Sequence, residues 1–322
     1  MESYKNKYLK YKQKYIQLKK SIFNLQQVGG KAKTSQNIIY FHYPCNDGLA
    51  AAWVARLKLE DVELRPYNHG NKIDLTIKNK TVYFLDMAPS LDVYKALKDT
   101  NDVYVLDHHK SNQVDYESLR DKNIYFDMNY SGVGLAWNFF FPKKEMPIFL
   151  QMIQGRDLFK FEIDNINEFI EILNLEMHAN KDLNKQLKIF DDLYSIKDKL
   201  EEFIDLGIPL VKQKELKVKA LGDKYINNIY IYEGHKLCMV NVDSDLTSDL
   251  GHYLTTKPQC DFAILWYYDH ISEKYHVSMR SFNKVDVSII CKKFGGGGHP
   301  NASACRIDKH PIIVFGKKKL KK

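Results

Sequence analysis

The order of apolar and polar residues divides the N-terminal half of the chain into strands that each end at a chemically active side chain. Residues 37–41, 81–85 and 103–106 are largely apolar runs of strand length, which is typical of buried parallel strands. Parallel strands end at the same edge of a sheet, where open α/β folds bind their ligands. The polar residues that follow these runs are therefore expected to converge: His42, Asp47, Asp86, Asp107, His108 and His109.

Helical segments alternate with these strands. A helix-forming run follows the first strand at residues 49–54, and further helices are expected at residues 90–97 and 135–141. Residues 124–126 are predicted to form a fourth strand. This alternation indicates right-handed crossovers, and hence an α/β domain with a parallel sheet and flanking helices in residues 35–205.

The remaining chain has two parts. Apolar residues recur at helical intervals between about residues 165 and 222, with a break at Gly207-Ile-Pro209, so residues 206–224 are expected to be a helical connector. From residue 225, short β-rich runs around one helix predict a smaller C-terminal α/β domain that spans residues 225–316. Its expected strands are residues 229–232, 237–240, 262–266 and 275–279, and its helix lies near residues 244–254.

The positive charge of the chain is concentrated at its ends. Residues 1–33 carry nine lysines and one glutamate, and the tail at residues 317–322 carries five lysines, so the formal charge of +8 leaves about −5 for residues 34–316. The net charge of residues 34–316 thus does not favour nucleic-acid binding by this part of the chain. Tyr and Leu recur at helical spacing in residues 1–34, which predicts a basic amphipathic leader. This leader is either an accessory tail or a segment that binds nucleic acid, an anionic membrane or another partner.

Cysteine usage and hydropathy indicate a soluble intracellular protein. The five cysteines show no CxxC pairing, which favours a reduced compartment. No run of about 18 apolar residues is present, so no transmembrane segment is expected. We therefore expect a cytoplasmic protein; its oligomeric state does not follow from the sequence.

The predicted convergence of carboxylates and imidazoles is typical of a metal site. Such ligands suit Mn²⁺ or Mg²⁺, and two ions about 3.5–4 Å apart clamp a phosphate and activate a water for in-line attack. A further acid, Asp157, lies between Gly155-Arg156 and Phe159. Taken singly, Asp86 and Asp157 also suit turns or helix caps, so the metal-site interpretation depends on the joint pattern.

A second group of candidate residues lies near the C-terminus. Gly295 to Gly298 permit positive φ and a close backbone approach, so their N–H groups are expected to cradle a phosphate. A helix is expected to begin at His299. The expected substrate-binding residues are Arg280, Gly296, Gly297, Gly298 and His299, although a bare glycine run is also typical of a flexible loop.

Together these motifs resemble the DHH phosphoesterase family. The set stands in the family's order: His42 with Asp47-Gly48, then Asp86, then Asp107-His108-His109, then Gly155-Arg156-Asp157-Leu158. Residues 277–281 and 294–302 are similar to the DHH-associated C-terminal domain that accompanies RecJ-like and oligoribonuclease-like members.

The resemblance covers about residues 36–312. It implies a DHH domain at residues 35–205 and a substrate-binding domain at residues 225–316. The leader resembles those of giant DNA virus proteins, which implies a viral protein in the host cytoplasm, with packaging into virions as an alternative.

The resemblance also implies roles for individual residues. Two manganese ions are expected, with Mg²⁺ as the alternative metal. His42 and Asp86 would hold one ion, and Asp47, Asp86, His108 and Asp157 the other. Asp107 would orient its neighbours from behind the ligands. His109 would face the substrate phosphate.

The first motif departs from the family pattern at Cys45. Many members have Asp-x-Asp where this chain has Cys45-Asn46-Asp47, one residue nearer to His42 than in some relatives. Because thiolates prefer softer metals, the sequence favours Cys45 as a weak ligand or none, with a thiolate ligand as the alternative.

The sequence therefore predicts a metal-dependent phosphodiesterase or exonuclease that acts on short RNA or DNA oligonucleotides or on small nucleotides. Two alternatives stay open. One is a DHH-fold protein with weakened catalysis that binds nucleic acid or a partner, and the other is a pyrophosphatase or polyphosphatase.

Overall fold

The computed structural model describes residues 36–68, 71–119, 121–195, 200–316 and 318–319, and residues 36–322 form one compact unit. The predicted leader at residues 1–34 lies outside the described residues. Among the described helices, none is long and apolar enough to span a bilayer.

A five-stranded parallel sheet forms the N-terminal region, with strand order β2-β1-β3-β4-β5. The four predicted strands are present, as β1 (Asn37–His42), β3 (Thr81–Leu85), β4 (Asp102–Asp107) and β5 (Ile124–Phe126). The sequence analysis missed the edge strand β2 (Val62–Tyr67). Its run Val-Glu-Leu-Arg-Pro-Tyr contains two charged residues and a proline, which suit an edge strand but hide the apolar pattern.

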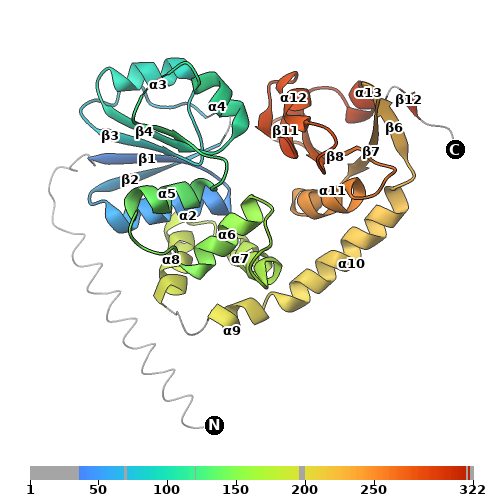
Figure 1. The fold of residues 1–322 in the computed structure, drawn as a ribbon, viewed down its shortest axis with the longest axis horizontal. Helices are drawn as coiled ribbons and strands as arrows, with labels where there is room; N and C mark the ends of the chain where they lie inside the picture. The colour runs from blue at the N-terminus through green and yellow to red at the C-terminus, as the bar shows by residue number, and fades with distance from the viewer. Residues whose placement is uncertain (1–35, 69–70, 120, 196–199, 317, 320–322) are drawn as a thin grey trace, which may run out of the picture. The chain divides into compact units, whose positions relative to one another are not determined.

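Helices cover both faces of this sheet, so successive strand residues pack into different cores (Figure 1). Ile39 and Phe41 pack with α2 (Asn46–Lys58) and α5 (Gly132–Phe140). Ile38 and Tyr40 point to the opposite face, against α3 (Leu91–Lys98) and the end of α4 (Lys110–Tyr116). This double cover explains why the strands read as continuous apolar runs, and it confirms the predicted α/β fold.

Helices occupy the middle of the chain. They are α6 (Ile148–Asp157), α7 (Ile166–Ala179), α8 (Leu183–Ser195), α9 (Leu200–Asp205) and α10 (Ile208–Tyr225). Pro209 lies in the first turn of α10, where its missing N–H leaves no intrahelical bond unmade. The predicted break therefore separates α9 from α10, which leads to the second sheet.

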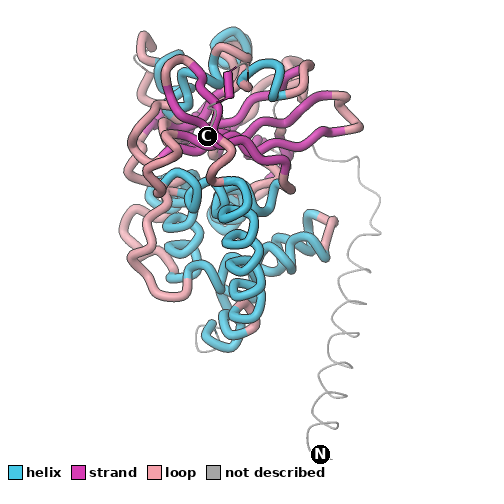
Figure 2. Tube along the Cα trace, turned by 90° about the vertical axis from the view of Figure 1, so that its right-hand side faces the viewer, coloured by secondary structure: helices cyan, strands magenta, loops and turns pink. Residues whose placement is uncertain are grey.

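The C-terminal region is built on a seven-stranded mixed sheet with strand order β10-β11-β9-β8-β7-β6-β12. Figure 2, which is turned so that the right-hand side of Figure 1 faces the viewer, shows strands in the upper part of the molecule and helices below them. The strands are β6 (Ile229–Tyr232), β7 (His235–Asn241), β8 (Phe262–Asp269), β9 (Lys274–Ser281), β10 (Gly297–His299), β11 (Ala302–Ile307) and β12 (Lys318–Lys319). The helices are the 3₁₀ turn η2 (Ser244–Leu246), α11 (Thr247–Thr255), α12 (Val287–Lys292) and α13 (Pro311–Phe315).

One expectation for this region was wrong. No helix begins at His299, because β10 continues through a turn into β11 and the two strands pair antiparallel. The alternating side chains of Ala302–Ile307 bury every second residue, which is the strand period rather than the helical one. Within the predicted basic tail, residues 318–319 pair with β6 and so belong to the sheet.

Candidate metal centre and active site

The carboxyl ends of the parallel strands bring the predicted ligands to one edge of the sheet. His42 ends β1, Asp107 ends β4, and Asp86 directly follows β3. Asp47 lies in the first turn of α2, and Asp157 is the last residue of α6. Two compact groups result, each with its ligand atoms within 4.8 Å of one another: His42, Cys45 and Asp86, and Asp47, His108 and Asp157.

Asp86 belongs to the first group and also approaches the second. One carboxylate oxygen, Oδ2, is 3.3 Å from His42 Nδ1, and the other, Oδ1, is 3.1 Å from His108 Nε2. The residue adopts φ +57° and is 2% exposed, an uncommon backbone conformation for a residue with a side chain. Strained backbone of this kind is often found at functional sites.

Asp47 is held by the start of α5. It accepts hydrogen bonds from Ser131 Oγ at 2.7 Å and from the backbone N–H groups of Gly132 and Val133 at 2.5 and 3.1 Å. A Cβ on Gly132 would lie 2.3 Å from Asp86 Cβ, so only glycine allows this approach. The sequence analysis gave Ser131 and Gly132 no role, because nothing local links them to Asp47.

Asp157 approaches the same imidazole from α6. Its Oδ2 lies 3.4 Å from His108 Nε2, while Asp47 Oδ2 lies at 4.0 Å. Removal from bulk water raises the pKa of both carboxyls, and the negative charge of Asp86 raises them further. The three carboxylates thus repel one another in a partly dry site, where a bound cation relieves the repulsion.

Asp107 positions the two histidines that follow it. Its buried carboxylate accepts bonds from the backbone N–H of His108 at 2.8 Å and of His109 at 3.3 Å, and it lies 2.7 Å from His109 Nδ1. Asn112 Nδ2 donates a further bond at 2.6 Å. Burial alone would raise the pKa of Asp107, but His109 and Asn112 outweigh it and hold the pKa below its usual range.

The pKa values of the histidines also indicate that this site favours positive charge. Burial lowers the pKa of His42, but its bonds with Asp86 and Cys45 outweigh this and raise the pKa to about 12. In His108 burial is likewise outweighed by the carboxylates, which raise the pKa to about 10. Among the described residues, buried His108 Nδ1 has no hydrogen-bond partner, whereas Nε2 faces three carboxylates. Oxygen and imidazole ligands of this type fit Mn²⁺ or Mg²⁺.

Cys45 lies beside His42 at the N-terminal end of α2. Burial raises the pKa of its thiol, although the hydrogen bond with His42 acts in the opposite direction. A thiol that stays protonated is a poor ligand for hard cations. Cys45 belongs to the first group of candidate ligands. Its role as a metal ligand stays a prediction.

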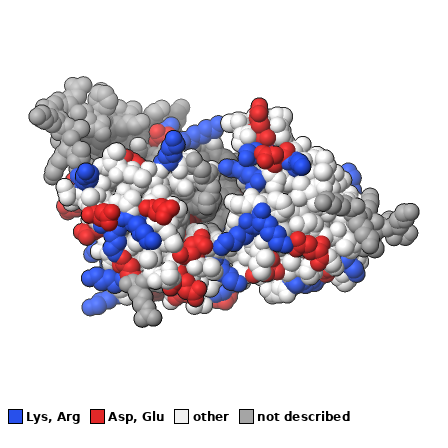
Figure 3. All heavy atoms as spheres, turned by 90° about the horizontal axis from the view of Figure 1, so that it is seen from above, with Lys and Arg blue, Asp and Glu red and all other residues white. Residues whose placement is uncertain are grey.

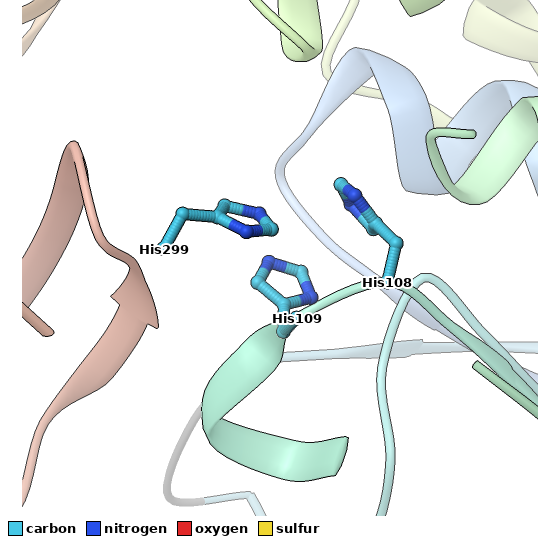
Figure 4. A group of neighbouring side chains, drawn as sticks. All are labelled: His108, His109 and His299. Atoms are coloured by element: carbon cyan, nitrogen blue, oxygen red, sulfur yellow. The ribbon is translucent and has the colours of Figure 1, made fainter. Parts of the chain in front are cut away.

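His299 faces the two histidines from the second sheet (Figure 4). Its ring centroid is 4.9 Å from that of His109, in a stacked arrangement, and 4.8 Å from that of His108. Burial and the neighbouring imidazoles lower the pKa of His299 to about 3, so its ring is neutral at physiological pH.

The glycine run brings His299 to this position through backbone packing. Gly298 has φ +133°, and its N–H donates to Ser111 Oγ on α4 at 3.3 Å. The Gly296 N–H donates to the Cys291 carbonyl at 3.0 Å. These two N–H groups therefore have partners inside the protein, and phosphate binding by the run stays a prediction.

Arg280 lies at the end of β9. Its side chain crosses Gly251 of α11, where an added Cβ would meet Arg280 Cγ at 2.5 Å, and its guanidinium donates to Ser248 Oγ at 3.1 Å. Burial lowers the pKa of Arg280 to about 10, which leaves it charged at neutral pH.

A polar cavity of about 250 Å³ adjoins the acids. Arg156 and Lys214 line it, and both bind Asp249 of α11, each at 2.8 Å. The sequence analysis did not foresee this link, because the three residues lie far apart in the chain. The cavity is also lined by Cys45, Asn46, Asp47, Asp157 and Ser248.

Comparison with known proteins supports the family resemblance. The DHHA1 domain family matches residues 246–320. The chain is a relative of the DHH phosphoesterases. It is 25% identical over 319 residues to the oligoribonuclease NrnB of Bacillus subtilis, covering 86% of this chain and 75% of NrnB. It is 29% identical over 309 residues to the uncharacterized protein R106 of Acanthamoeba polyphaga mimivirus, covering 88% of this chain and 69% of that protein.

Solved structures with related folds have low sequence identity to this chain. The pGpG-specific phosphodiesterase PggH of Vibrio cholerae is 14% identical, with a TM-score of 0.44, and the match covers 84% of this chain and 92% of PggH. RecJ of Thermus thermophilus, solved with Mg²⁺, is 12% identical with a TM-score of 0.41, and the match covers 88% of this chain and 48% of RecJ.

Proposed function

We propose that this DHH-type chain is a manganese-dependent phosphodiesterase that hydrolyses short oligonucleotides. The observation that carries the proposal is Asp86, whose two carboxylate oxygens approach imidazoles of different ligand groups. A carboxylate in this position is suited to bridge two cations. The activity of NrnB, named as an oligoribonuclease, supports the choice of substrate class.

In this proposal His42 and Asp86 would hold one ion, and Asp47, Asp86, His108 and Asp157 would hold the second. Divalent ions in such a pair supply Lewis-acid activation of water and neutralise developing charge on the phosphate. The Ser131 hydroxyl and the α5 amides fix Asp47. Asp107 fixes the ring of His109, which faces the phosphate together with neutral His299.

In this proposal each predicted domain has its own role. Residues 35–205 carry the metal ligands, residues 206–224 connect, and residues 225–316 hold the substrate through Arg280, His299 and the run Gly296 to Gly298. A short substrate also agrees with the surface charge. Figure 3 shows basic and acidic side chains interspersed over the face in view, whereas a long duplex track favours a continuous basic stripe.

The test is hydrolysis of a 5′-labelled RNA tetranucleotide by the full chain with Mn²⁺, compared with the same reaction in EDTA. We expect mononucleotide release that requires the metal and is lost in Asp157→Ala. Asp223→Asn is the matched control, because among the described residues this exposed acid hydrogen-bonds Lys219 and Tyr253, away from the candidate ligands. Release of orthophosphate from pyrophosphate without cleavage of the tetranucleotide would identify the pyrophosphatase alternative. No turnover of either substrate would favour the binding protein.

A further inference from the structure

Three exposed phenylalanines form a row beside the candidate active site. Phe159, Phe161 and Phe282 are 40%, 42% and 47% exposed. Phe159 contacts Phe161 edge-on at 4.9 Å between ring centroids, and it lies 4.9 Å from the ring of His252, which lies 5.4 Å from Phe282. Four rings from three segments of the chain thus make a continuous aromatic surface, here called the aromatic row (Phe161, Phe159, His252 and Phe282).

The aromatic row and the active site share the same supporting segments. At the end of α6, Asp157 faces the metal ligands, and Phe159 follows two residues later. In α11, Ser248 lines the cavity, and His252 joins the row one turn further along. After β9, Phe282 follows Arg280 by two residues. The aromatic row thus lies on the same three segments that carry Asp157, Ser248 and Arg280.

The backbone of Phe159 adopts a left-handed conformation that is unfavourable for a residue with a side chain. Helix α6 ends in a Schellman motif, in which the N–H of Lys160 bonds the Gly155 carbonyl at 2.7 Å and the N–H of Phe159 bonds the Arg156 carbonyl at 3.3 Å. This places Phe159 at φ +57°, a position that glycine usually occupies. The chain keeps a large aromatic residue there although glycine would fit with less strain.

The chemistry of the row suits a nucleobase. Burial lowers the pKa of His252, which favours the neutral ring. The Arg156 guanidinium lies 5.9 Å from the centre of the Phe161 ring and adds a cation beside the row. Aromatic rings next to cations bind single-stranded nucleic acid by stacking, with little dependence on base identity.

We propose that the aromatic row is a stacking subsite for a base of a single-stranded oligonucleotide whose phosphate occupies the adjacent site. This inference rests on the proposed function and makes it more specific, because pyrophosphate and polyphosphate have no base to stack. It predicts that recognition depends on bases at this position but tolerates any of the four.

The test compares binding of a fluorescein-labelled tetranucleotide with binding of the same oligomer made abasic, by anisotropy on the full chain. Ca²⁺ replaces Mn²⁺, so that the carboxylates are neutralised while binding is read without turnover. We expect the wild type to prefer the base-bearing oligomer by about tenfold or more, as stacking on one base gives. Phe159→Gly and Phe282→Ala should lose most of this preference, while Phe159→Trp retains it.

Two controls separate recognition from structure. Tyr268→Ala removes an aromatic ring of similar exposure outside the row, and it should keep the wild-type preference. Phe159→Gly relieves the positive φ, so its unfolding temperature should equal or exceed that of the wild type even though binding weakens. A side chain that only packs the two regions together would instead lower the unfolding temperature when removed.

Equal binding of the two oligomers by the wild type, or no binding of either, overturns the proposal. Full base preference in both Phe159→Gly and Phe282→Ala does so as well. Because the readout does not depend on turnover, base-dependent binding without hydrolysis would support the aromatic row while refuting the proposed activity.

Discussion

The two sheets supply their functional residues in different ways. In the parallel sheet, neighbouring strands end together, so His42, Asp86 and Asp107 meet because of strand register. In the mixed sheet, His299 and Arg280 reach their positions because glycines let other chain segments pass closely. Strand ends can be recognised in a sequence, whereas close packing between distant segments cannot. The difference predicts that substitutions at the strand ends of the parallel sheet abolish catalysis. Substitutions at the glycines of the mixed sheet should instead lower the stability of the fold.

The largest loss of activity is expected at Asp86, the proposed ligand that both ions would share. Asp86→Asn keeps the shape of the side chain but removes the charge that faces both His42 and His108. Metal-ion catalysis is worth several kcal/mol, so kcat should fall by about 10³-fold or more. Tetranucleotide hydrolysis under saturating Mn²⁺ measures this, with circular dichroism to confirm folding. Activity within tenfold of the wild type would rule out a bridging role.

A smaller loss of activity is expected at Asp107, which supports a neighbouring histidine rather than a metal ion in this account. Asp107→Asn removes the charge that orients His109 and weakens the bonds to two backbone amides. Loss of such supporting contacts typically costs about 10–100-fold in activity or metal affinity. The kcat of Asp107→Asn should therefore lie between those of Asp86→Asn and the wild type. Equal losses in both variants would place Asp107 among the metal ligands themselves.

Packing in the second sheet is tested by two neighbouring glycines. A Cβ on Gly296 would lie 2.1 Å from the Ala304 carbonyl oxygen and 2.6 Å from Cys305 Cβ, whereas Gly295 has open space and φ +72°. Gly296→Ala should lower the free energy of unfolding by about 1–3 kcal/mol through overpacking. Gly295→Ala carries only backbone strain, of about 1–2 kcal/mol. Chemical denaturation compares them, and a greater loss in Gly295→Ala would contradict the close approach.

The smallest effect concerns the link between α6, α10 and α11. Although burial raises the pKa of Asp249, Arg156 and Lys214 outweigh it and lower the pKa below its usual value near 3.8. A lowered pKa means that Asp249 stabilises the fold above about pH 4 and loses this contribution as the pH falls through its folded-state pKa. Asp249→Asn should destabilise the protein by about 0.5–1.5 kcal/mol at pH 7. Thermal unfolding should show the difference from wild type shrinking toward pH 3, and a constant difference would contradict the ion pairs.

The sequence predicted the parallel sheet and the convergence of its acids and histidines, because both depend on local patterns repeated along the chain. It missed β2, whose charged residues and proline hide an edge strand. The mixed sheet was predicted in outline, but the glycine run was expected to start a helix. The aromatic row and the Arg156–Asp249 pair were not foreseen, since each joins the end of α6 to α11, which lie about ninety residues apart in the chain. Such contacts have no signature in a single sequence.

The most direct test of the central claim is the number of Mn²⁺ ions that the chain binds. Isothermal titration calorimetry of metal-free full-length protein should give two ions per chain, and Asp86→Asn should lose at least one of them. Two ions in the wild type would support Asp86 as the bridge despite Cys45 in the first motif. No binding in the wild type, or two ions retained in Asp86→Asn, would contradict the account of this site.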